Sequence, residues 1–124
     1  MELTPVIPSG RQVIESYDTN GFRVTGIAYA RSILVFPDAT LDWPVSGIED
    51  VTVATLQPVI ERGGIEILLL GCGPRMMPVP AVLRQALKAA GIGLEAMDTG
   101  AACRTYNVLL AENRRVAAAL VRPS

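Results

Sequence analysis

The chain of 124 residues is long enough for one domain with a sizeable core, because single cores typically fill about 100 to 150 residues. Half of the residues are apolar and 19% are charged, which excludes a disordered chain. Eleven Lys and Arg against twelve Asp and Glu leave a formal net charge of -1, so no global field attracts nucleic acid or an anionic membrane.

Histidine and cysteine content limits the chemistry open to this chain. Histidine is absent, which removes the commonest general base and metal ligand and disfavours hydrolases of the familiar triad kind. Cys72 and Cys103 are too few for a secreted disulfide scaffold, and they cannot complete a tetrahedral metal site without other ligands or a second chain. We therefore expect neither a metal nor a cofactor.

The hydropathy pattern predicts a cytoplasmic protein. No window approaches the roughly 18 consecutive apolar residues of a membrane span. The N-terminal sequence also lacks the basic region followed by an apolar stretch that marks a signal peptide.

The first third of the chain predicts antiparallel strands. Residues 1–10 contain two prolines and a glycine and predict an extended lead-in. Segments 12–18 and 21–26 flank Asn20-Gly21, a pair that tolerates positive φ and favours a tight hairpin turn. Residues 32–37 read as a buried strand that Pro37 ends.

The rest of the chain alternates between strand and helix patterns. A short helix is predicted at about 55–62, although Pro58 removes one backbone donor there. Strands are predicted at 65–71, 93–97 and 114–121, and helices at 80–91 and 99–113. The expected buried face of the helix at 80–91 consists of Val82, Leu83, Ala86, Leu87 and Ala90. This order of strand, helix, strand, helix and strand predicts an α/β unit with mostly parallel strand pairing, within a single domain.

The turn from Gly71 to Arg75 follows a buried strand and is the first candidate site. The Gly71-Cys72-Gly73 sequence superficially resembles a dinucleotide-binding loop, but the third glycine of that motif is missing and Pro74 has no backbone donor. No Gly-Lys-Ser/Thr follows, so the turn is not a Walker loop either. The preferred interpretation is a tight turn at a strand end, with nucleotide binding as a minor alternative.

The second candidate site begins at Asp98 and Thr99, either of which can cap the helix that follows. Such a cap would leave free N–H groups at the positive end of the helix dipole. Both candidate sites follow strands, so both are expected at the carboxyl edge of the sheet, where open α/β sheets bind ligands. Arg75 and Arg104 would then flank one small anion.

Packing is the competing interpretation of this second helix. Four residues share one helical face, and cysteine is among the most buried residue types. These residues are Cys103, Tyr106, Asn107 and Leu110. In the packing interpretation Tyr106 and Asn107 satisfy buried backbone groups, and Arg104 pairs with Glu112 or Asp98. The sequence leaves packing and ligand binding open at these positions.

Two further alternatives concern the sulfur-containing side chains. Cys72 and Cys103 would lie at the same sheet edge, but the absence of a Cys-x-x-Cys pattern and the cytosolic setting disfavour a catalytic disulfide. Met76 and Met77 are flanked by prolines and would form either an apolar contact for a partner or a filler of the core.

Four segments together resemble the Mth-like domain family, which includes the mitochondrial NADH dehydrogenase (complex I) assembly factor 3 and the adipogenesis-associated Mth-like domain protein. They are FPDATLDWPV at 36–45, LLLGCGP at 68–74, MDTGAACRTYN at 97–107 and LLAENRRVAAAL at 109–120. The resemblance spans about Asn20 to Val121. It implies a single α/β domain with a central mixed β-sheet, an added N-terminal antiparallel β layer and two to three helices packed on the sheet.

The resemblance also implies a function. The mitochondrial member helps to build the peripheral arm of complex I through protein contacts, so this chain is expected to be a non-enzymatic assembly protein. Its expected partners are peripheral-arm subunits or other assembly factors, with no nucleic acid, and membrane contact only through those partners. The expected ligand- or partner-binding residues are Gly71, Cys72, Gly73, Arg75, Asp98, Thr99, Cys103, Arg104, Tyr106 and Asn107. The alternative is a small-anion-binding protein or enzyme that uses the same edge, from Gly71 to Met77 and from Asp98 to Asn107.

Overall fold

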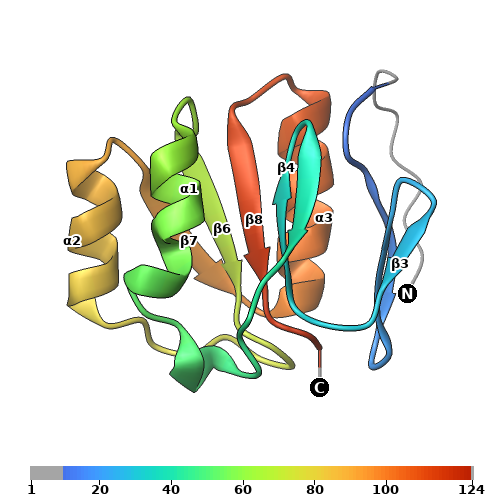
Figure 1. Ribbon diagram of the computed structural model, residues 1–124, viewed down its shortest axis with the longest axis horizontal. Coiled ribbons are helices and arrows are strands. Elements are labelled where there is room, and N and C mark those ends of the chain that lie inside the picture. Colours follow the sequence, from blue (N-terminus) through green and yellow to red (C-terminus); the bar gives the residue numbers. More distant parts are fainter. Residues whose placement is uncertain (1–9, 124) are drawn as a thin grey trace.

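The computed structural model describes residues 10–123, whose strands form two sheets (Figure 1). The smaller sheet is antiparallel, with the strand order β1-β2-β3. Its strands are β1 (Ile14–Asp18), β2 (Gly21–Val24) and β3 (Ile27–Tyr29). The lead-in predicted for residues 1–10 lies, apart from Gly10, outside the described residues.

The larger sheet has the strand order β5-β4-β8-β6-β7 and mixes the two kinds of pairing. Its strands are β4 (Ile33–Phe36), β5 (Ala39–Asp42), β6 (Ile67–Gly71), β7 (Gly93–Met97) and β8 (Val116–Leu120). β6 is parallel to both of its neighbours, β7 and β8, because helices connect these strands. β4 is antiparallel to both β5 and β8.

Helices cover both faces of the larger sheet (Figure 1). The helices α1 (Gln57–Arg62) and α2 (Ala81–Ala89) lie on one face, and α3 (Thr99–Ala111) lies on the other. Two 3-10 turns, η1 (Ile48–Asp50) and η2 (Ala54–Leu56), precede α1.

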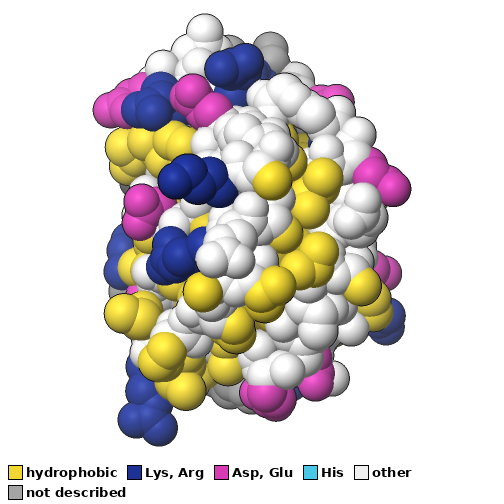
Figure 2. Space-filling model, turned by 90° about the vertical axis from the view of Figure 1, so that its left-hand side faces the viewer, with side chains coloured by type: hydrophobic (Ala, Val, Ile, Leu, Met, Phe, Trp, Pro, Cys, Tyr) yellow, Lys and Arg dark blue, Asp and Glu magenta, His cyan; other side chains and the backbone are white. Residues whose placement is uncertain are grey.

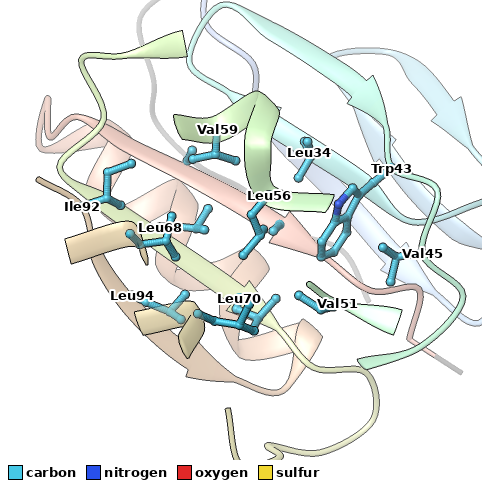
Figure 3. Close-up of a cluster of buried hydrophobic side chains, with 14 of the residues drawn as sticks. Leu34, Trp43, Val45, Val51, Leu56, Val59, Leu68, Leu70, Ile92 and Leu94 are labelled. Atoms are coloured by element: carbon cyan, nitrogen blue, oxygen red, sulfur yellow. The ribbon is translucent and has the colours of Figure 1, made fainter. Parts of the chain in front are cut away.

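Each face of the larger sheet has its own core. Successive residues of a strand point to opposite faces, so Leu68 and Leu70 of β6 pack with α1 and α2, whereas Leu69 packs with α3. Figure 3 shows the first core, where Leu56 lies among side chains from the strands and Trp43 closes one side. The Trp43 indole N–H donates to Thr55 O at 2.8 Å, which satisfies its polar group.

Most of the predicted elements are confirmed. The strand predicted at 93–97 coincides with β7, and α3 and β8 fall within the segments predicted for them. Pro58 lies in the first turn of α1, where the missing N–H breaks no helical hydrogen bond. The mixed sheet with its added antiparallel layer confirms the predicted fold class.

The strands differ from the prediction in one turn and in two additional strands. The β1–β2 hairpin turns at Thr19-Asn20, and Gly21 already belongs to β2 with a φ of +128°. Glycine is required there because a Cβ atom would lie 2.0 Å from the Tyr29 carbonyl oxygen. Strands β3 and β5 have no counterpart among the predicted strands. β3 pairs with β2, and β5 forms because Pro37-Asp38 turns the chain back along β4 instead of ending the sheet.

The buried face of α2 is also narrower than predicted. Leu83 and Leu87 are buried, but Val82 is 58% exposed and Ala90 is exposed as well. The physical reason is that α2 packs against β7 at the margin of the sheet and therefore buries only one stripe.

Asn107 of α3 joins the smaller sheet to the larger one. Its Oδ1 atom accepts from the Ile14 N–H at 3.1 Å, and its Nδ2 atom donates to Ile14 O at 2.8 Å. Asn107 and Ile14 are both buried, at 5% and 0% exposure. The amide therefore replaces a strand partner for β1 at the point where β1 meets the helix.

We predict that Asn107→Ala lowers the free energy of unfolding by about 2 to 4 kcal/mol, because both polar groups of Ile14 lose their buried partner. Urea unfolding monitored by circular dichroism measures the change. Val108→Ala, on the exposed side of the same helix, is the control and should shift stability by less than about 0.5 kcal/mol. An Asn107→Ala protein as stable as the control would contradict this role.

Candidate functional site

The carboxyl edge of β6 carries the first candidate site, and the backbone groups of its turn bond internally. The Cys72 N–H donates to Met97 O at 2.8 Å, and the Gly73 N–H donates to Thr99 Oγ1 at 2.8 Å. Pro74 has no N–H to offer. The turn is thus no phosphate cradle, which supports the interpretation of a tight strand end.

Thr99 makes three hydrogen bonds to two sequence-distant segments at this edge. Its backbone N–H donates to Gly73 O at 2.8 Å, and its hydroxyl donates to Val121 O at 2.7 Å while accepting from Gly73. A Cβ atom at Gly71 would lie 3.0 Å from Thr99 Cα. Thr99 is completely buried, and it holds the ends of β6, β8 and α3 together.

Asp98 caps α3, as predicted, but few of the N–H groups of the first turn stay free. Asp98 Oδ1 accepts from the Ala101 N–H at 3.0 Å, and the Ala102 N–H donates to Asp98 O. Tyr17 from β1 covers Gly100, since a Cβ atom there would lie 2.7 Å from the tyrosine hydroxyl. The expectation of an open anion site at this helix end is therefore wrong: the chain itself occupies the end.

The packing interpretation of α3 is confirmed. Cys103, Tyr106, Asn107 and Leu110 are all buried in the core that α3 forms with the two sheets. The Tyr106 hydroxyl donates to Gln12 O at 3.1 Å, so both Tyr106 and Asn107 satisfy backbone groups near the start of β1. Burial raises the pKa of Cys103 to about 12, and burial also raises the pKa of Tyr106.

The two arginines of the predicted anion site lie in different surroundings. Arg104 Nη1 donates to the Tyr17 hydroxyl across the interface between α3 and β1. Its pairing with Glu112 or Asp98 stays a prediction. Arg75 instead lines a surface pocket of about 180 Å³. Arg104 is not among the residues that line this pocket.

The two cysteines belong to opposite faces of the larger sheet. Cys72 packs in the core with α1 and α2, whereas Cys103 packs in the core with α3. Both are buried free thiols. This separation contradicts a catalytic disulfide between them.

The accessible part of the predicted site is the loop Pro74–Met77. Met76 and Met77 are 61% and 37% exposed, so they do not fill the core. Met77 and Arg75 line the pocket of about 180 Å³ together with Cys72, Gly73 and Pro74. The sequence prediction missed the remaining pocket residues, which are Ser46, Gly47, Ile48, Glu49, Val121 and Arg122. No local pattern marks them, because they come from the segment around η1 and from the chain after β8.

Other kinds of site have little support in the described part of the chain. No group of three or more His, Cys, Asp or Glu side chains there is arranged to hold a metal ion. Among residues 10–123, every buried side-chain nitrogen or oxygen has a hydrogen-bond partner. None of the helices in that range has the length and apolar character needed to cross a membrane.

Comparisons with known proteins relate the chain to one family. A family model described as protein of unknown function (DUF498/DUF598) matches residues 14–121. The NADH dehydrogenase (ubiquinone) 1 alpha subcomplex assembly factor 3 of Danio rerio is 38% identical over 93% of this chain and 67% of its own length. The chain thus spans about two thirds of that relative.

Solved structures share the fold. A crystal structure of a Bordetella parapertussis protein aligns with a TM-score of 0.86 and 35% identity, covering 93% of this chain and 99% of its own. A solution structure of a Bordetella pertussis protein, described as a Mth938-like domain, aligns with a TM-score of 0.83 and 29% identity, covering 100% of this chain and 94% of its own.

We predict that Thr99→Val lowers the free energy of unfolding by about 2 to 4 kcal/mol, because Gly73 N–H and Val121 O lose their buried partner. Thr105→Val makes the same chemical change at a half-buried position of the same helix and should cost about 1 kcal/mol or less. Urea unfolding compares the two variants. Equal losses would show that the Thr99 hydroxyl has no special role.

The buried thiol predicts a pH dependence of stability. The pKa of Cys103 rises from its ordinary value of 9.0 to about 12 on folding, so above pH 9 the unfolded chain releases a proton that the folded chain keeps. Stability is therefore intact below pH 9 and falls above it, by up to about 1.4 kcal/mol per pH unit.

Urea unfolding at several pH values between about 7 and 10.5 measures this loss. Cys103→Ala should flatten the profile above pH 9, even though it lowers stability at every pH. A profile with an unchanged slope in Cys103→Ala would refute the assignment to this thiol.

Proposed function

Since the chain belongs to the family of Mth938-like domains described as protein of unknown function (DUF498/DUF598), we propose that it is a non-enzymatic assembly protein of the respiratory NADH dehydrogenase (complex I). In this proposal it acts through protein contacts. The observation that carries this proposal is the 38% identity to an assembly factor over 93% of the chain. In this proposal the protein works in the cytoplasm and reaches the membrane only through its partners, which are peripheral-arm subunits or other assembly factors.

The internal bonding of the sheet edge supports contact rather than catalysis. The polar groups that a substrate would need are already bonded, since Thr99, Asp98 and Asn107 each bond to the protein's own backbone. A general base or nucleophile at this edge would need a free, accessible group, and the buried Cys103 thiol has a pKa of about 12.

The exposed loop Pro74–Met77 and the pocket beside it form the docking surface in this proposal. Methionine adapts its shape to an apolar partner, and Met76 is 61% exposed. Arg75 and Arg122 line the same pocket and offer planar donors to carboxylates of a partner. Of the ten expected site residues, Arg75 is exposed and lines this pocket with the buried Cys72 and Gly73, whereas Gly71 is buried and is not among its lining residues.

We predict that deleting the gene in a bacterium that contains complex I lowers the amount of assembled enzyme. The wild-type gene should restore it, and the double variant Arg75→Glu, Met76→Glu should restore less than about a third, because a charged loop repels an apolar partner. Native gels with in-gel NADH dehydrogenase activity measure the assembled complex. Arg23→Glu, on the exposed face of β2, is the control and should complement fully.

Normal complex I in the deletion strain would refute the assembly role. In that case a thermal-shift screen with phosphate and small carboxylates tests the alternative function, a small-anion site. A rise in Tm that depends on Arg75 and Arg122 would establish that alternative, because these residues line the pocket.

A further inference from the structure

A groove runs along the free edge of the larger sheet, away from the pocket of the Pro74–Met77 loop. Its volume is about 450 Å³, and its wall is the start of β7 with the residues just before it. The lining residues are Arg84 and Lys88 from α2, and Gly91, Ile92, Gly93 and Leu94. Figure 2 views the molecule from this side and shows apolar side chains in a band, with Lys and Arg side chains beside it.

β7 is an edge strand whose outer polar groups have no strand partner in the described part of the chain. The Gly93 N–H donates to Glu66 O, and Met97 O accepts from Cys72, so these residues turn their polar groups toward β6. Backbone groups of alternate residues point to opposite edges, so those of Leu94 and Ala96 point away from the sheet. Such a row of groups is a template for one more strand.

Arg84 occupies part of this template. Its Nη1 atom donates to Leu94 O at 2.6 Å, reaching over from α2. The carbonyl is thus satisfied in the free protein by a flexible, exposed side chain, not by another strand. A charged side chain on an edge also prevents the same edges of two copies from pairing, because Arg84 and Lys88 would meet their counterparts.

The charge of the groove selects its occupant. Arg84 and Lys88 are its two cations, no acidic residue lines it, and Lys88 is the sole lysine of the chain. Glu95 lies on the opposite face of β7, since successive side chains alternate. An acidic segment therefore gains two charge contacts in this groove, whereas a basic segment or a second copy is repelled.

We propose that an extended acidic segment of a protein partner binds here as a sixth strand along β7. The segment donates a backbone N–H to Leu94 O, which releases Arg84 to pair with one of its carboxylates, while Lys88 pairs with another. Main-chain bonds supply the affinity and the two cations supply the specificity. This inference rests on the proposed assembly function, because it names the chemistry of the partner.

Site-specific crosslinking tests the proposal in a living bacterium. A photoreactive phenylalanine replaces Glu95, whose exposed side chain would neighbour the added strand without disturbing either cation. Mass spectrometry then identifies the crosslinked segment. The expected segment carries at least two acidic residues at alternate positions, and the double variant Arg84→Glu, Lys88→Glu should reduce the crosslink at least about tenfold.

Arg23→Glu is the matched control, because Arg23 is also an exposed arginine that donates to a backbone carbonyl, Gly26 O at 3.1 Å. It should leave the crosslink unchanged. Exchanging the acidic residues of the captured segment for lysines should restore the crosslink to the Arg84→Glu, Lys88→Glu protein. With a synthetic peptide of that segment, the Ala96 amide of the labelled protein should exchange at least about tenfold more slowly.

Each other result overturns the edge-strand proposal. In the crosslinking experiment these results are no crosslink, capture of a basic or helical segment, capture of a second copy of this chain, or a crosslink that survives the charge reversal of Arg84 and Lys88. In the exchange experiment the result is an Ala96 amide that the peptide does not protect. The assembly role is judged separately by the gene deletion. If complex I depends on the protein but the Arg84→Glu, Lys88→Glu variant complements fully, the edge proposal fails and the assembly role stands. If complex I is indifferent to the deletion, the assembly role fails and the crosslink alone decides the chemistry of the partner.

Discussion

The hydroxyl of Thr99, at the start of α3, and the amide of Asn107, two turns further along the same helix, hold the fold together. Asn107 fixes β1 of the smaller sheet by two hydrogen bonds to Ile14, and Thr99 binds the ends of β6 and β8. A polar side chain in a core needs a hydrogen-bond partner, because the free energy lost by removing it from water otherwise exceeds the free energy gained by packing. The sheets can therefore meet α3 in only one register, and the burial of Cys103 and Tyr106 follows from it.

The carboxyl edge of the larger sheet is filled by the chain's own side chains, and this affects where a ligand or partner can bind. Open α/β sheets bind small ligands at the carboxyl ends of their strands, where loops and helix ends leave free N–H groups. In this protein Thr99, Asp98 and Tyr17 occupy the carboxyl ends of the strands. This edge therefore connects the larger sheet to α3 and β1. Our proposals therefore place partner recognition elsewhere, on the loop Pro74–Met77 and on the free edge of β7.

Local charge matters more than net charge in this protein. The formal charge of -1 predicts no general attraction to anions. Yet Arg84 and Lys88 face one groove without an acidic neighbour in its lining, and Arg75 and Arg122 line a second pocket. The fold thus gathers cations of a nearly neutral chain at particular sites, although Glu49 also lines the second pocket. Charges act most strongly at contact distance, where salt screens them least.

The sequence by itself determined the elements that depend on neighbouring residues. The aliphatic run of β6, the Asp98 cap and the helical face from Cys103 to Leu110 each follow from local pattern, and the family resemblance extended them to the fold class. Only the tertiary structure decided which distant groups meet. It paired Asn107 with Ile14 and Arg104 with Tyr17, put the two cysteines on opposite faces, formed β5 by pairing with β4, and placed Arg84 over Leu94 O. These contacts join residues that are far apart in the sequence. Local periodicity cannot predict them, because it indicates which face of an element a side chain lies on and not which distant residue it contacts.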